Sequence, residues 1–205
     1  MVRPRGATDA EIVERVSAFL GAREWPSATW TLAEVAPAAG LSPAGILKRF
    51  GSRAGLLRAL GQQWLDTIPS GPRFADPLTE LRTYCGAMFA APSAAAALGG
   101  LGDLLADLAD ETSAALLREG SDKQARYVAA LLRGMALPRV GDPLLAARVL
   151  LDALHGGLIR GASGASDSGG ASDSGGASGA SGAGSAGVPA GAVDTTIDYF
   201  LTLWR

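Results

Sequence analysis

The sequence predicts an all-α fold of about nine helices, because three patterns agree along the chain. Alanine and leucine dominate and recur at helical spacing. β-Branched residues are few and scattered, so no segment is expected to form a strand. Ser, Thr or Asp residues precede many of the apolar runs, where they can cap helix starts. With 205 residues and 48% apolar side chains, the chain is long enough for a small domain joined to a larger one.

The small domain, residues 8–64, is expected to contain four short helices, and we call it the head. Capping boxes at Thr8–Glu11 and Thr31–Glu34 begin the first two helices. Ser42-Pro43 begins the third helix with an N-cap and a first-turn proline, and Gly51-Ser52 ends it and caps the fourth. The apolar residues expected to turn inward are Ile12, Val13, Val16, Phe19, Leu20, Leu32, Val35, Ala36, Ala39, Ile46, Phe50, Leu56, Leu57 and Leu60.

The larger domain, residues 73–205, is expected to be helical as well, and we call it the body. Residues 161–187 contain only Gly, Ala, Ser and Asp, and such a tract cannot bury enough apolar area to offset its ordering entropy. We therefore expect a disordered linker there, followed by a last helix that returns to the body. Start signals such as Ser93 place the body helices near 77–91, 93–109, 111–136, 142–160 and 190–204.

Charge is distributed unevenly between the two domains. Residues 1–64 hold eight Lys or Arg and five Asp or Glu, a net charge of +3, whereas the whole chain carries −2. A basic head on an acidic body is typical of a protein that presents only one end to a polyanion.

Several classes of function are not expected. The single cysteine, Cys85, and the single histidine, His155, leave no intramolecular disulfide and no standard zinc site within the chain. The sequence contains no nucleophile–base constellation, phosphate-binding glycine loop or metal-ligand spacing, so we expect neither an enzyme nor a cofactor nor a metal. No apolar run is long enough to cross a bilayer, and no signal-peptide core follows the N-terminus. We expect a cytoplasmic protein without a membrane partner.

The second and third helices of the head have helix-turn-helix proportions. They are predicted at 31–39 and 42–50 and are joined through Gly40-Leu41, where glycine permits a sharp turn. In such a motif the second helix enters the major groove of DNA, and basic residues beside it contact phosphates. The alternative for residues 31–50 is a plain helical hairpin within an all-α core.

The sequence from Thr31 to Leu57 resembles the N-terminal signature of the TetR/AcrR family of transcriptional regulators. It has a capped helix ending in Ala-Ala-Gly, a Leu-Ser pair, a recognition helix closing on Phe, and then Ser-Arg before paired leucines. The resemblance covers about residues 8–64. It implies a repressor that binds a near-palindromic operator in double-stranded DNA and is released by a small apolar ligand. The DNA-facing positions that it implies are Thr31, Pro43, Ala44, Gly45, Leu47, Lys48, Arg49 and Arg53.

Two positions depart from the family pattern. Leu47 stands where an aromatic residue, most often Tyr, is usual, so the phosphate contact from a tyrosine hydroxyl is absent. Pro37 removes an amide donor inside the second helix and is expected to kink it. Both support an alternative in which the head has lost DNA binding and the chain is a helical ligand-binding or scaffolding protein. An all-α enzyme is a third hypothesis, but no chemical constellation supports it.

The body offers candidate ligand-binding residues, although core packing explains the same pattern. Cys85 is either a thiol sensor or a buried apolar residue, and burial is favoured because only Arg82 is near it in sequence. His155, before Gly156-Gly157, is either a ligand contact, a pH-sensitive interface group or a packing histidine. The candidate ligand contacts are Tyr84, Met88, Phe89, Tyr127, Leu131, Met135 and His155.

The helix predicted at 142–160 is apolar on nearly all sides, so it must be covered all round. One side can face the body and the other a second copy of the chain. Paired with the helix at 190–204 and their symmetry mates, it predicts a four-helix homodimer interface. Two heads then read two half-sites, and a ligand in the body changes their spacing.

Overall fold

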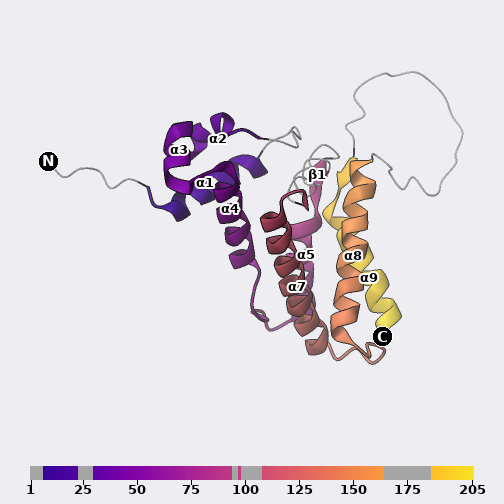
Figure 1. The fold of residues 1–205 in the computed structure, drawn as a ribbon. Coiled ribbons are helices and arrows are strands. Elements are labelled where there is room, and N and C mark those ends of the chain that lie inside the picture. Colours follow the sequence, from indigo (N-terminus) through magenta and orange to yellow (C-terminus); the bar gives the residue numbers. More distant parts are fainter. Residues whose placement is uncertain (1–6, 23–29, 94–96, 98–107, 164–185) are drawn as a thin grey trace, which may run out of the picture.

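Eight helices and one short pair of strands make up the part of the chain that the structure describes (Figure 1). The structure is a computed structural model and describes residues 7–22, 30–93, 97, 108–163 and 186–205. The predicted all-α class is therefore confirmed for these residues, apart from the two strands. No helix among them is both long enough and apolar enough to span a membrane.

The head contains α1 (Asp9–Gly21), α2 (Leu32–Ala39), α3 (Pro43–Phe50) and α4 (Arg53–Thr67). Both predicted capping boxes form, with the hydroxyls of Thr8 and Thr31 each accepting from the backbone amide three residues on at 3.3 Å. The predicted inward side chains meet in one cluster, and five are fully buried: Ile12, Val16, Val35, Ile46 and Leu56.

Phe19 corrects the predicted core of the head. Its side chain is 38% exposed, whereas Val13 and Val16 of the same helix are buried. Helical periodicity places Phe19 at the margin of the stripe formed by Val13, Val16 and Leu20, so it stands at the edge of the core.

Helix α4 runs from the head to the body, where it packs on α7 (Glu111–Gly134) (Figure 1). Two glycines allow this close approach. A Cβ at Gly61 of α4 would lie 2.8 Å from the side chain of Leu116, and a Cβ at Gly120 of α7 would overlap the ring of Trp64. Lys123 of α7 donates to the carbonyl of Leu65 at 2.7 Å, near the C-terminal end of α4, where a cation complements the helix dipole.

The body contains α5 (Pro77–Phe89), α7, α8 (Pro143–Ala162) and α9 (Ala190–Trp204). Asp side chains cap α5, α7 and α8, and together these helices enclose a second apolar core. Arg82 of α5 forms ion pairs with Asp194 and Asp198, which tie α5 to α9. The fully buried residues of this core include Leu81, Val128, Leu131, Leu150 and Ile197.

The body helices follow the predicted ranges closely, with one exception. The helix at 190–204 has the predicted bounds, whereas α5 ends at Phe89 and α8 continues to Ala162. The exception is the helix predicted at 93–109. Most of it lies outside the described residues, and Ser93, which was expected to begin it, lies in a strand.

The strands β1 (Ala91–Ser93) and β2 (Ala186–Val188) correct the prediction that no strand forms. They pair antiparallel, with Ala91 opposite Val188. Val188 is buried against Gly161, where a Cβ would overlap its side chain. The bounds of the predicted linker, 161–187, are therefore too wide at both ends, and the segment between, residues 164–185, lies outside the described residues. Sequence patterning missed the pair because three-residue strands carry no periodicity.

Glu80 is a buried carboxylate that fastens the connection between α4 and α5. It is 1% exposed and accepts hydrogen bonds from the Tyr127 hydroxyl at 2.6 Å and from the amide of Phe74 at 2.8 Å. The amide of Arg73 also donates to it, at 2.8 and 2.9 Å. Burial alone would raise the pKa of Glu80, but these hydrogen bonds outweigh it and hold the pKa below its ordinary value.

Replacing Glu80 by Gln is expected to lower the free energy of unfolding by about 2–3 kcal/mol at neutral pH, because its donors lose a charged acceptor. The pKa of Glu80 is lowered from 4.5 in the folded state, so its contribution is present above pH 4.5 and is lost as pH falls through the folded-state pKa. Urea unfolding from pH 7 to pH 3 tests this, with exposed Glu119→Gln as control. Equal losses in the two variants would contradict it.

Candidate nucleic-acid interface and body cavity

The turn between α2 and α3 depends on Gly40, whose φ of 66° lies in the left-handed region. The amide of Leu41 donates to the carbonyl of Ala36 at 3.2 Å, and the amide of Gly40 donates to that of Pro37 at 3.1 Å. This is the hydrogen-bond pattern of a Schellman motif, which ends one helix and redirects the chain into the next. Helix α2 continues through Pro37 to Ala39, so the proline does not break it.

Helix α3 turns one face inward and the other to solvent. Ile46 is fully buried in the head core, and Leu41 and Phe50 are partly buried against the same core. The exposed positions include a large apolar side chain, Leu47, which is 44% exposed. Of the predicted DNA-facing residues on this helix, the exposed ones are Pro43, Ala44, Leu47, Lys48 and Arg49, whereas Gly45 is half-buried.

The basic residues at this face differ in whether they form ion pairs or hydrogen bonds with other protein groups. Arg49 forms an ion pair with Asp9 in the first turn of α1. Arg53 donates through Nε to the carbonyl of Trp30 at 3.0 Å, and its guanidinium lies 4.3 Å from the centre of the Trp30 ring. Lys48 is exposed and has no partner among the described residues. Lys48 is therefore the cation most available to a phosphate.

Sequence reasoning missed Asp9 and Trp30 as partners of the two arginines, because neither is close to its arginine along the chain. Thr31, another predicted contact, is exposed, but its hydroxyl accepts from the Glu34 amide and donates to the Glu34 carboxylate at 2.8 Å. Its main role in the free protein is to cap α2.

Gly55, in the first turn of α4, sets the angle between α3 and α4. The Ser52 hydroxyl accepts from the Gly55 amide at 3.0 Å, and a Cβ at Gly55 would overlap the carbonyl of Phe50. Only glycine therefore lets α4 begin this close to the end of α3. A repeat of the same Ser-x-x-Gly cap begins α3 at Ser42, where the Gly45 amide donates at 3.0 Å.

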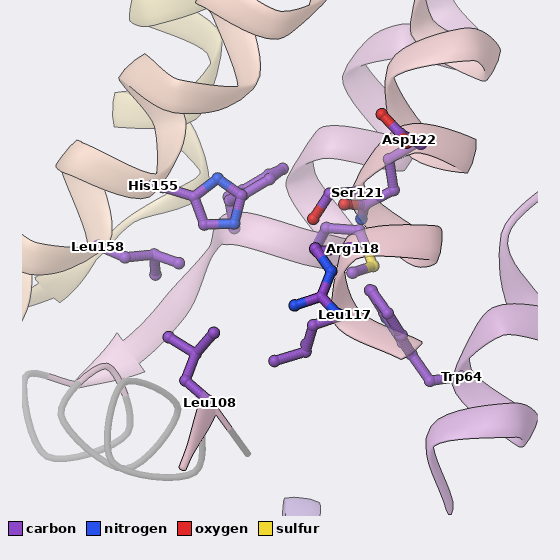
Figure 2. A pocket seen from close by; sticks show the side chains of 11 residues that line it. Trp64, Leu108, Leu117, Arg118, Ser121, Asp122, His155 and Leu158 are labelled. Carbon is purple, nitrogen blue, oxygen red and sulfur yellow. The ribbon is translucent and has the colours of Figure 1, made fainter. Parts of the chain in front are cut away.

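An open cavity of about 640 Å³ lies between α4, α5, α7 and α8 (Figure 2). Three of the predicted ligand contacts, Met88, Phe89 and His155, line it. Tyr84, Tyr127 and Leu131 are buried in the body core, and Met135 packs partly buried against that core. Sequence reasoning did not select the other lining residues, which are Trp64, Leu108, Leu117, Arg118, Ser121, Asp122, Gln124 and Leu158.

His155 is held by neighbours on both sides of its ring. The ring meets Phe89 edge-on with centroids 4.8 Å apart, and Nδ1 lies 2.8 Å from the carbonyl of Leu151. A carbonyl only accepts, so Nδ1 carries the proton and Nε2 is left to face other partners. Figure 2 shows His155 and Leu158 on one side of the cavity and Arg118, Ser121 and Asp122 on the other.

Two further groups in the body lie apart from this cavity. Cys85 is fully buried, as predicted, and burial raises the pKa of its thiol to about 12, which leaves it unreactive. The Tyr84 hydroxyl is buried, and its burial raises the pKa of Tyr84 to about 12. Among the described residues, no group of His, Cys, Asp and Glu is arranged to hold a metal ion.

Comparison with protein-family models and with curated proteins finds no match to this chain.

Replacing Gly55 by Ala is expected to destabilise the head by about 1–3 kcal/mol, because the added methyl group overlaps a backbone carbonyl. The matched control is Gly86→Ala in α5, where nothing lies within 4 Å of the added Cβ. The control should gain about 0.5–1 kcal/mol from helix propensity. Thermal unfolding followed by circular dichroism measures both, and a gain in stability at Gly55 would show that the corner is not constrained.

Proposed function

We propose that the chain is a DNA-binding transcriptional regulator of the TetR/AcrR type that acts as a homodimer and is released from its operator by a small ligand. The observation that carries the proposal is the α2–α3 pair. Two short capped helices meet at a left-handed glycine, and the outer face of α3 is exposed at the end of the head that points away from the body (Figure 1). An α-helix presented in this way fits the major groove.

The chemistry of α3 indicates how DNA is read. Pro43, Ala44 and Leu47 offer apolar contacts, suited to thymine methyl groups, and few base-directed hydrogen bonds. Lys48 supplies a phosphate contact, and Arg49 supplies a second when it leaves Asp9. Exposed ion pairs are weak, so a phosphate can displace the Asp9 carboxylate. Affinity then rests mainly on the backbone of DNA, and its shape contributes to sequence choice.

The homodimer is supported by apolar side chains on the outer surface of α8 and α9. Leu145 and Ile159 of α8 are 58% and 57% exposed, and Tyr199 of α9 is 63% exposed. Val149 and Leu203 extend these faces by one helical turn each and are also exposed. A second copy of the same surface covers them, because two heads are needed to read a symmetric operator.

The alternative from another class is a helical ligand-binding protein whose head no longer binds DNA. The observation that favours it is the pairing of Arg49 and Arg53 with protein groups, which leaves Lys48 as the one unpaired cation of the three. An electrophoretic mobility shift with the DNA upstream of the coding sequence separates the two functions. A shift that labelled random DNA does not reproduce supports the regulator.

Changing the charges around α3 is expected to move DNA affinity in opposite directions. Lys48→Ala with Arg49→Ala weakens binding to all sequences, and loss of the Lys48 contact alone lowers the salt slope by about 0.9 per head. Asp9→Asn frees Arg49 and strengthens binding about two- to fivefold. Titrations at several salt concentrations measure this. Glu14→Gln, on the same helix as Asp9, is the control, and an equal gain there would show only a general charge effect.

Placing Asp at Leu145 and Val149 together is expected to convert the dimer into a monomer, because four buried carboxylates would face one another across the symmetric interface. Sedimentation equilibrium measures the mass, and the mobility shift of the same variant should weaken. Ala115→Asp, at an exposed site on α7, is the control. A wild-type chain that sediments as a monomer at micromolar concentration would contradict the homodimer.

A further inference from the structure

We propose that the body cavity binds an amphiphilic monocarboxylate, with its carboxylate on Arg118 and its hydrocarbon part between α4, α5, α7 and α8. This deepens the proposed function, on which its regulatory consequence rests, by naming the class of ligand. It replaces the expectation of a purely apolar ligand.

Among the described residues that line the cavity, the basic side chain is that of Arg118, and it forms no ion pair with another described residue. The acidic residue of the lining, Asp122, is already paired with Arg148, with the two charged atoms 3.2 Å apart. Arg118 has no partner among the described residues, and Figure 2 shows its guanidinium directed into the open space beside Leu117. An anion entering the cavity therefore meets a guanidinium that forms no ion pair with a described residue, beside a carboxylate that is already paired with Arg148.

One guanidinium selects a singly charged ligand. The planar fork of an arginine matches the two oxygens of a carboxylate, and such pairs are stronger than neutral hydrogen bonds. A phosphate monoester carries nearly two charges and would leave one without a partner here. The nearby Ser121 and His155 add hydrogen-bonding groups, but the described lining holds no second arginine or lysine to match that charge.

The remainder of the cavity is apolar, which requires a hydrocarbon body on the ligand. Met88, Phe89, Leu117 and Leu158 form walls around the charged end. A cavity of about 640 Å³ accommodates a medium-chain acid or an aryl acid of a few rings. Burying that hydrocarbon supplies most of the affinity, and Arg118 supplies the choice of head group.

An occupant also touches the helix that carries the head. Trp64 of α4 lines the cavity, and its ring lies over Gly120 of α7. The chain has four tryptophans, so the part of the fluorescence change that Trp64→Phe removes reports on occupancy, without any need for DNA in the assay.

The test compares decanoate, decan-1-ol and decylammonium, with the two ions below their micelle concentrations and the alcohol below its solubility limit. Binding is measured by isothermal titration calorimetry and by the tryptophan fluorescence change that Trp64→Phe removes. Decanoate is expected to bind the wild-type chain about tenfold more tightly than decan-1-ol, and decylammonium more weakly still. Arg118→Gln should abolish the preference for decanoate over decan-1-ol, and Arg118→Lys should keep part of it. Arg126→Gln, an exposed arginine farther along α7 that does not line the cavity, is the matched control.

Equal binding of the acid and the alcohol, no binding of decanoate, or an unchanged preference in a folded Arg118→Gln variant would each overturn the proposal. Circular dichroism and the Arg118→Lys variant establish that the fold is intact. Adding decanoate to the operator complex separates this proposal from the regulatory one. Arg118-dependent binding that leaves the mobility shift unchanged supports the ligand class and counts against the ligand-released regulator.

Discussion

The close crossing of α4 and α7 is the constraint on which the rest of the molecule depends. The ring of Trp64 packs directly on Gly120, and the side chain of Leu116 packs directly on Gly61. The two helices therefore approach each other more closely than larger residues at these positions would permit. The hydrogen bond from Lys123 to the carbonyl of Leu65 then fixes the position of α4 relative to α7. Because α4 belongs to the head core at one end and packs on the body at the other, this crossing decides where α2 and α3 point.

Glycines also set the geometry of the head. Its turns are set by glycines at positions 40 and 55, one for its backbone conformation and one for space, and two of its cations, Arg49 and Arg53, are held by protein groups. Pairing restricts the side chains of these two arginines and lowers their attraction to unrelated polyanions. Under the proposed function, the two arginines would exchange partners on binding DNA, and Lys48, which has no partner among the described residues, would make the first contact.

Local features were predictable and distant ones were not. The capping boxes at Thr8 and Thr31 and the range of α9 are encoded within a few residues, and all form as predicted. The Asp9–Arg49 pair joins residues 40 apart, and the β1–β2 pair joins segments nearly half the chain apart, so no local pattern reveals them. The lining of the cavity also depends on how the helices pack, so local sequence patterns do not identify it. Of seven aromatic, apolar and imidazole side chains chosen by helical position, three line it, because one helical face serves both core and cavity.

The β1–β2 clasp has a consequence for how the chain tolerates change in length. Helix α8 ends at Ala162 and β2 begins at Ala186, and the side chain of Val188 packs against Gly161, so the described residues on either side of 164–185 are held to each other. Closing a longer loop costs only about 0.6 kcal/mol for each doubling of its length. Lengthening the tract of short repeats is thus expected to leave the helices in place, which makes it a point for attaching a fused domain or label.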